Sequence, residues 1–427
     1  MKYFKNTAWL LIEKSLRIIE AFFIGIWIAR YLGPQDFGIL SYSQSFVYIF
    51  AAFAALGLDQ IVVKELVKNP EKRDEILGTT LGLRLLGFVL MFTIIYTTLQ
   101  LTESNASIQA IILIIATSIL FQSFNGIDFH FQSKVLSKYV VFTNVIVVVT
   151  MGIAKIVLIL NNASLMSFAY VFASETFLTA LGFILAYTYN KFDITKWKFR
   201  LKVAKKLLKQ SWFLILGSIA ASLYMKIDQV MIKEIMDEKA VGIYSVAVRL
   251  SGIWLFVTVA ITQSVFPALV ETRKRDRQLF LDRLQLLYNL LVKISMVVSI
   301  LYVIFADYFV VVLFGIEYAD SVQVVVIYIW SIVFVFLSNG SWGFYLNENL
   351  EKFSSIRLII GAIINIILNI YFIKIYGLLG AAYATIISYS ISGYLVNFIF
   401  KKTRTNFYLQ TKAFINLFNI STWKKPF

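Results

Sequence analysis

Cysteine is absent from this chain of 427 residues, and histidine occurs only once, at His130. These absences exclude disulfides, thiolate nucleophiles and metal sites built from cysteine or several histidines, so we expect no metal and no cofactor. The sequence also lacks a G-x-x-x-x-G-K-[ST] loop, which excludes ATP hydrolysis at a Walker site. Charged residues make up 15% of the chain, against about 25% in soluble domains. We expect His130 in a short cytoplasmic turn, as an ordinary polar residue.

Apolar residues dominate instead: 59% of the chain is hydrophobic and the mean hydropathy is +0.77. A helix crosses a bilayer with about 20 apolar residues. Breaks at charged residues, glycine and proline predict helices over 8–30, 38–63, 77–101, 109–127, 139–161, 165–189, 207–233, 241–270, 285–314, 322–346, 354–376 and 378–400. Twelve helices leave no room for a soluble catalytic domain, so we predict an all-α integral membrane protein that is not an enzyme.

Lysine and arginine gather in alternate connections of these helices. The richest connection, 191–209, contains eight of them in the stretch KFDITKWKFRLKVAKKLLK. The opposite connections hold few basic residues, namely Arg30, Lys233, Lys239 and Lys374. Because basic connections stay in the cytoplasm, both termini are predicted to be cytoplasmic.

The two halves of the chain resemble each other. Phe37-Gly38-Ile39-Leu40-Ser41 aligns with Val241-Gly242-Ile243-Tyr244-Ser245. A repeat of six helices inserts each half in the same orientation, so the pseudo-two-fold axis would lie along the membrane normal. We predict a six-helix lobe over 1–190, a basic cytoplasmic linker over 191–206, a second six-helix lobe over 207–400 and a basic cytoplasmic tail over 401–427. The linker is either an amphipathic segment on the inner leaflet or a plain connection that sets topology.

Seven basic residues fall inside predicted spans: Lys14, Arg17, Arg84, Lys155, Lys226, Arg249 and Lys293. A cation near the bilayer centre costs roughly 3 kcal/mol, so we predict that these residues line a central cationic cavity and bind an anionic substrate. The acids within the spans are Glu13, Glu20, Glu175 and Asp228. They are candidates for ion coupling or for internal pairing, because Glu13, Arg17 and Glu20 share one helix face. Arg84 and Lys293 could also snorkel to the interface.

The segment Ile28–Tyr42 (IARYLGPQDFGILSY) resembles a signature of the Wzx-type polysaccharide, or O-antigen, flippases. These flippases belong to the multidrug/oligosaccharidyl-lipid/polysaccharide exporter superfamily. Their first two helices carry the pattern ARYLGP-x-x-FG-x-x-x-Y/F, which this segment matches closely. Gly33 and Pro34 suit an outer turn that stops the first helix, and Gly38 allows close packing where the second begins. Arg30 would snorkel and cap the helix, or would place a cation at the mouth of the cavity.

The resemblance implies a flippase of the bacterial inner membrane that moves an undecaprenyl-diphosphate-linked oligosaccharide to the outer leaflet by alternating access. Its partners would be this lipid-linked oligosaccharide, membrane lipids and other polysaccharide-assembly proteins, without nucleic acid. H⁺, Na⁺ or the membrane potential could drive it. Polar residues that could contact the sugars are Gln122, Asn125, Asn144, Asn339, Trp342 and Tyr345. The alternatives are a membrane polymerase or ligase of lipid-linked sugars, and a cation-coupled multidrug exporter of the same superfamily.

Overall fold

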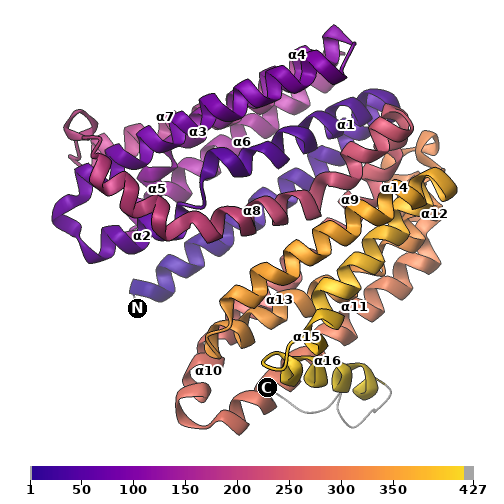
Figure 1. Cartoon of the computed structure of the whole chain (residues 1–427). Coiled ribbons are helices and arrows are strands. Elements are labelled where there is room, and N and C mark those ends of the chain that lie inside the picture. The colour runs from indigo at the N-terminus through magenta and orange to yellow at the C-terminus, as the bar shows by residue number, and fades with distance from the viewer. Residues whose placement is uncertain (1, 418–427) are drawn as a thin grey trace. The chain divides into compact units, whose positions relative to one another are not determined.

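The computed structural model describes residues 2–417, and all regular elements in this range are helical, as predicted (Figure 1). The first half of the chain forms α1 (Lys2–Ala55), α2 (Asp59–Lys68), α3 (Arg73–Thr102), α4 (Ala106–Gln122), α5 (Gly126–Ser133), α6 (Lys138–Leu160) and α7 (Leu165–Tyr189). The second half forms α8 (Leu201–Ile235), α9 (Glu238–Gly252), α10 (Trp254–Arg275), α11 (Arg277–Phe314), α12 (Ser321–Tyr328), α13 (Ser331–Asn347), α14 (Glu351–Ser390), α15 (Val396–Ile399) and α16 (Arg404–Asn416). A π-helical stretch, Ile391–Leu395, joins α14 to α15.

Ten helical segments of the described chain are long and apolar enough to cross a membrane. Two of them are far longer than one crossing requires, since about 20 residues suffice: Ile12–Lys68 has 57 residues and Glu351–Ile399 has 49. Within the first, α1 is broken at Gly33 (φ 70°) and ends before a turn at Leu56-Gly57, and within the second, α14 is broken at Gly377 (φ 58°). Counting two crossings in each of these segments gives the twelve spans predicted, and Gly33-Pro34 does interrupt the first helix.

Several predicted helix boundaries differ from the structure. The predicted span 109–127 ends at Gln122, and the chain continues into the short helix α5. His130 lies in α5, not in a turn, and is only 1% exposed. Its ring packs against those of Tyr187 and Phe192. The prediction of a turn was wrong because these aromatic partners come from distant parts of the chain.

The chain divides into two compact units. We call them the N-terminal unit (residues 1–32 and 39–226) and the C-terminal unit (residues 33–38 and 227–427). In the N-terminal unit α7 packs against both α4 and α6, and α3 packs against α4. A buried apolar core lies among α2, α3, α5, α7 and the start of α8 and includes Leu58, Leu77, Phe131, Tyr187 and Leu207.

The predicted linker packs on the N-terminal unit. The Lys198 amide donates to the Asp74 carbonyl at 3.1 Å, and the Arg200 amide donates to Thr79 Oγ1 at 3.0 Å. A Cβ on Gly78 would lie 2.5 Å from the Lys198 backbone, and one on Gly82 would lie 2.6 Å from the Phe199 ring. The linker therefore packs directly against these two glycines of α3.

The tail also packs on the protein. The helix α16 contacts α11, and its Asn406 and Gln410 are fully buried. Tyr288 donates to Asn406, and Gln410 Nε2 donates to Ser341 Oγ at 3.0 Å. Residues 418–427 of the predicted tail lie outside the described residues.

The outer turn and its repeat meet within the C-terminal unit. A Cβ on Gly38 would lie 1.7 Å from the Glu238 carbonyl oxygen, and a Cβ on Gly242 would lie 2.0 Å from the Pro34 carbonyl oxygen. In the alignment of the two segments Gly38 corresponds to Gly242 and Pro34 corresponds to Glu238, so the two contacts join equivalent positions in opposite directions. A two-fold axis produces this reciprocity, so the contact agrees with the repeat found in the sequence. Both glycines are needed because the backbones touch.

Candidate functional site

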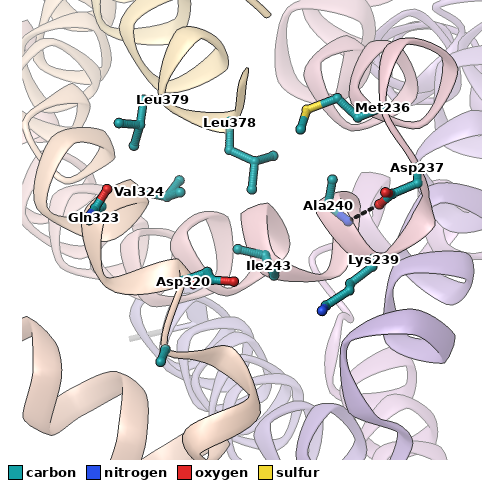
Figure 2. Close-up of a pocket in the computed structure, with 11 residues that line it drawn as sticks. Met236, Asp237, Lys239, Ala240, Ile243, Asp320, Gln323, Val324, Leu378 and Leu379 are labelled. Atoms are coloured by element: carbon teal, nitrogen blue, oxygen red, sulfur yellow. Dashed lines mark hydrogen bonds between the residues drawn. The ribbon is translucent and has the colours of Figure 1, made fainter. Parts of the chain in front are cut away.

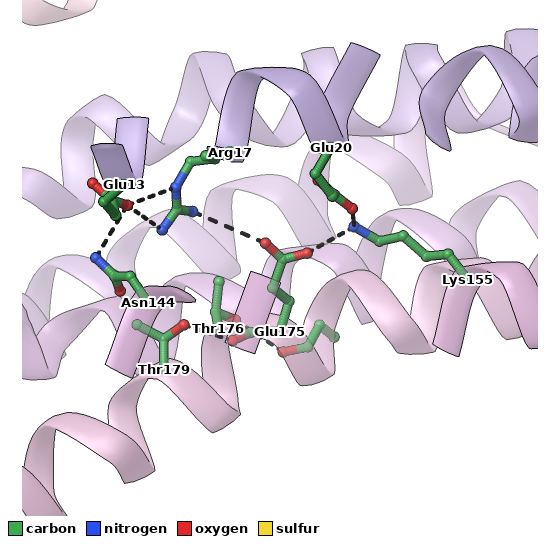
Figure 3. A network of polar contacts seen from close by, with 9 residues as sticks. Glu13, Arg17, Glu20, Asn144, Lys155, Glu175, Thr176 and Thr179 are labelled. Atoms are coloured by element: carbon green, nitrogen blue, oxygen red, sulfur yellow. Dashed lines mark hydrogen bonds and ion pairs between the residues drawn. The ribbon is translucent and has the colours of Figure 1, made fainter. Parts of the chain in front are cut away.

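Five charged side chains form one network in the N-terminal unit (Figure 3). They come from α1, α6 and α7, and we call them the ion network: Glu13, Arg17, Glu20, Lys155 and Glu175. Arg17 Nη2 lies 3.0 Å from Glu13 Oε1 one turn earlier in α1, as the i, i+4 spacing predicts. Lys155 Nζ lies 2.9 Å from Glu20 Oε1 and 3.0 Å from Glu175 Oε2.

Lys155 is the most buried cation of the ion network, with 5% of its side chain exposed. Its ammonium lies 5.0 Å from the centre of the Phe172 ring, an attractive position for a cation. Gly152, one turn earlier in α6, makes room for its partner, because a Cβ there would lie 3.5 Å from Glu20 Cγ and 2.9 Å from Ile24 Cδ1. The sequence therefore places a small residue where a buried ion pair joins α1 and α6.

Arg84 forms a second ion pair in the N-terminal unit. Its side chain is 6% exposed, and its guanidinium binds the Asp59 carboxylate and donates to the Gln122 carbonyl at 2.9 Å. The ring of Phe129 lies 5.0 Å from the same guanidinium. Arg84 is thus bound inside the protein and does not snorkel.

The other predicted cations have different surroundings. Lys226 lies 6.0 Å from the ring of Tyr48, and Arg249 lies 5.4 Å from the ring of Phe37. Lys293 is buried in α11, with 8% exposed, whereas Lys14 is exposed on α1. The structure brings Arg17 and Lys155 together through Glu175. Whether the seven cations contact a substrate stays a prediction.

Asp228 lies at the centre of a different cluster, in the C-terminal unit. It is 5% exposed and accepts hydrogen bonds from Asn369 Nδ2 and Thr385 Oγ1, both at 2.6 Å, and from the Tyr244 hydroxyl at 2.9 Å. Asn365 Oδ1 accepts from Asn369 Nδ2 at 3.1 Å. All of these partners are neutral, and within residues 2–417 no lysine or arginine forms an ion pair with Asp228.

The asparagine Asn369 gives this cluster one further feature. Its side-chain oxygen is buried and has no hydrogen-bond donor among the described residues. Within residues 2–417 no three histidine, cysteine or acidic residues gather as a metal site. The ligands present are oxygens from one carboxylate, amides and hydroxyls, a set that suits a proton or a hard monovalent cation better than a transition metal.

The C-terminal unit also contains a pocket of about 530 Å³ (Figure 2). It lies between the end of α8, the start of α9, α12 and the residues that follow the break at Gly377. Its polar residues are Asp237, Lys239, Asp320 and Gln323. Asp237 also caps α9 by accepting a hydrogen bond from the Ala240 amide at 2.7 Å. None of the seven predicted cations lines this pocket.

Sequence reasoning missed several partners. It did not pair Asp59 with Arg84, and it did not join Asn365, Asn369 and Thr385 to Asp228. A signal was present, because Asn365 and Asn369 are four residues apart in an apolar helix, where unpaired amides are costly. Among the predicted sugar contacts, Tyr345 is 1% exposed and donates to Asn397, and Asn144 donates to Glu13, so both are engaged inside the protein.

The comparison with protein families decides the affiliation. The profile of the family described as polysaccharide biosynthesis protein matches residues 3–273. The chain belongs to this family. The match confirms the resemblance to polysaccharide flippases drawn from the first two spans. The protein is a multi-pass membrane protein, as its apolar helices require.

Two archaeal proteins are similar in sequence to this chain. An uncharacterised membrane protein of Methanocaldococcus jannaschii is 23% identical over 91% of this chain and 82% of its own length. The probable low-salt glycan biosynthesis flippase Agl15 of Haloferax volcanii is 24% identical over 49% of this chain and 44% of its own length.

Solved structures show the fold. An inward-facing MATE-family multidrug transporter of the MOP superfamily superposes with a TM-score of 0.71 at 16% identity, covering 93% of this chain and 96% of the transporter. The lipid II flippase MurJ, in an inward closed conformation, gives a TM-score of 0.68 at 16% identity, covering 99% of this chain and 94% of MurJ. The chain therefore has the fold that both proteins share, and that fold does not distinguish between their functions.

Proposed function

We propose that this protein moves a lipid-linked oligosaccharide, carried on undecaprenyl diphosphate, from the cytoplasmic to the outer leaflet of a bacterial inner membrane. The observation that carries this proposal is the family match over residues 3–273, supported by the named glycan flippase among its relatives. Basic side chains inside the spans suit a diphosphate, because phosphate oxygens accept charge-assisted hydrogen bonds from lysine and arginine. The lobes would alternate in exposing the substrate to either side, with both termini in the cytoplasm.

Coupling to H⁺ or Na⁺ is proposed at Asp228. A buried carboxylate without a cationic partner is stable only if it is protonated, solvated by neutral donors or bound to a cation. The oxygens around Asp228, including the unsatisfied oxygen of Asn369, suit such an ion. The membrane potential would also assist, because moving two negative charges outward gains about 4.6 kcal/mol per 100 mV.

A second candidate function is multidrug export, and the likeness to the MATE transporter favours it as much as the likeness to MurJ favours a flippase. The two functions require different cavities. Export of cationic drugs would favour acidic residues, whereas seven basic residues fall inside the spans of this chain. We therefore favour transport of a lipid diphosphate over export of cationic drugs. Like the flippases among its relatives, the protein would be a transporter that carries out no chemistry on the sugar.

Deleting the gene in its own host tests the proposal. We expect loss of a surface polysaccharide and accumulation of its undecaprenyl-diphosphate-linked repeat unit on the cytoplasmic side, both restored by the wild-type gene. The lipid-linked intermediate is measured by extraction and mass spectrometry. Normal polysaccharide together with increased sensitivity to cationic drugs would contradict the flippase and support the drug exporter.

A further inference from the structure

One carboxylate of the ion network contacts both of its cations. Glu175 Oε1 lies 4.0 Å from Arg17 Nη1, and Glu175 Oε2 lies 3.0 Å from Lys155 Nζ. Figure 3 shows the two oxygens directed to opposite sides, one toward each cation. By contrast, within residues 2–417 Glu13 forms an ion pair only with Arg17, and Glu20 forms one only with Lys155. Glu175 is thus a bridging anion, and the other two acids are single partners.

The charge balance makes Glu175 the surplus acid. The ion network has three carboxylates and two cations. Without Glu175, each cation would still have one carboxylate partner, Glu13 for Arg17 and Glu20 for Lys155. Loss of Glu13 or of Glu20 would instead leave the two cations sharing Glu175. Glu175 is therefore the acid that can leave while each cation keeps a carboxylate of its own, and an unpaired buried charge is what costs most.

Exposure indicates the same residue. The exposed fraction of the side chain is 9% for Glu13, 14% for Glu20 and 19% for Glu175, and it reaches 45% for Arg17. An incoming anion would therefore reach the network at Arg17, and Glu175 is the most exposed of the three acids. Within residues 2–417 the Glu175 carboxylate has no hydrogen bond or ion pair beyond those to Arg17 and Lys155, and Thr179 Oγ1 donates to the Glu175 backbone carbonyl at 2.8 Å.

We infer that Glu175 occupies the place of a substrate phosphate and is displaced when the lipid diphosphate binds between Arg17 and Lys155. This inference rests on the proposed function. A phosphate group, like a carboxylate, presents two oxygens that can reach two cations at once. When the substrate leaves, the return of Glu175 restores the bridge and opposes rebinding by like-charge repulsion. The network would thus limit affinity and promote release.

The neighbourhood contains few other charges that could take this role. Lys14 is exposed on α1, and α4, which packs against α7, carries no charged residue. The neutral neighbours are Asn144, which donates to Glu13 at 3.3 Å, and the ring of Phe172 over Lys155. Glu175 is therefore the acid whose removal most directly exposes both cations to an outside anion.

The experiment measures the affinity of the purified full-length protein for geranylgeranyl diphosphate, a short prenyl diphosphate, by titration calorimetry in detergent. Glu175→Gln should bind the probe about tenfold more tightly than the wild type, in the range of coupling between interacting sites. The matched control is Glu65→Gln, which neutralises a carboxylate of the same unit that is 4% exposed and paired with Lys206. Glu65→Gln should leave the affinity unchanged, and Lys155→Gln should weaken it.

Each outcome decides something different. If the wild type binds the probe and Glu175→Gln binds it equally or more weakly, the inference is overturned while the proposed function stands. If no variant binds the probe, diphosphate recognition itself fails and the inference falls with it. Glu175→Ala serves as a second variant, and thermal unfolding of every variant shows that affinities are compared between folded proteins.

Discussion

The two units of this protein bury carboxylates in different ways. In the N-terminal unit, Glu20 and Glu175 both form ion pairs with the ammonium of Lys155, at 2.9 and 3.0 Å. In the C-terminal unit, Asp228 accepts from an amide and two hydroxyls, and no lysine or arginine of residues 2–417 forms an ion pair with it. Breaking a buried ion pair leaves an uncompensated charge, so such a pair opens most readily when another ion replaces one partner. A carboxylate held by neutral donors can instead take up a proton or a small cation in place.

This difference suits the two units to different roles. Ion pairs that an anion can enter suit the recognition of a phosphate, and a neutral oxygen cluster suits the coupling ion. The following substitutions test whether the two sites differ in the way their contacts imply. They are ordered from the largest expected loss of stability to the smallest.

Lys155→Ala should have the largest effect. It leaves Glu20 and Glu175 buried without their shared cation, and breaking a buried pair in this way costs about 3 kcal/mol or more. Thermal unfolding of the purified protein in detergent should show a clear decrease in the midpoint. Lys155→Arg, which keeps the charge, should recover most of it. An unchanged midpoint for Lys155→Ala would show that the ion network does not stabilise the N-terminal unit.

Gly38→Ala and Gly242→Ala should each cost about 2 kcal/mol, because the new methyl group would meet a backbone carbonyl and force the two segments apart. Gly252→Ala is the matched control, since a Cβ at Gly252 meets no atom within 4 Å. The same unfolding assay applies. Equal midpoints for all three variants would refute the close contact of the two repeated segments.

Asp228→Asn should cost about 1 kcal/mol, less than the loss of Lys155, because the cluster has no charge left unpaired and loses only the fit of its hydrogen bonds. If Asp228 binds the coupling ion, any stabilisation of the wild type by Na⁺ or by acid should disappear in this variant. Asp307→Asn, an exposed acid of α11, is the control. A loss as large as that of Lys155→Ala would remove the contrast between the two units.

Arg200→Ala should have the smallest effect, within about 0.5 kcal/mol, because its pair with Glu75 is exposed to 56% and 36% and such pairs contribute little. The hydrogen bond from the Arg200 amide to Thr79 remains. This variant measures how much an exposed ion pair contributes to the stability of the same unit. A loss comparable to that of Lys155→Ala would mean that burial does not determine the strength of these pairs.

Much of the fold could be predicted from the sequence, because span length and apolar composition are set by the bilayer. The break at Gly33 and the need for glycine at Gly38 also followed from local chemistry. The partners of the charged residues could not be predicted so well. Spacing on one helix identifies Glu13 and Arg17 as neighbours, but Lys155 meets Glu20 and Glu175 only through the packing of three helices. The contact of the linker with Gly78 and Gly82 likewise depends on how distant segments pack.

The central claim is that this protein carries a lipid diphosphate on its buried cations, and transport in proteoliposomes tests it most directly. A fluorescent polyprenyl-diphosphate-linked sugar is placed in the membrane, and its arrival in the other leaflet is followed by the action of an added membrane-impermeant glycosidase. We predict that the wild type accelerates the transfer and that Lys155→Arg retains part of this activity, while Lys155→Gln abolishes it in a protein that still folds. Transfer by Lys155→Gln at the wild-type rate would contradict the claim.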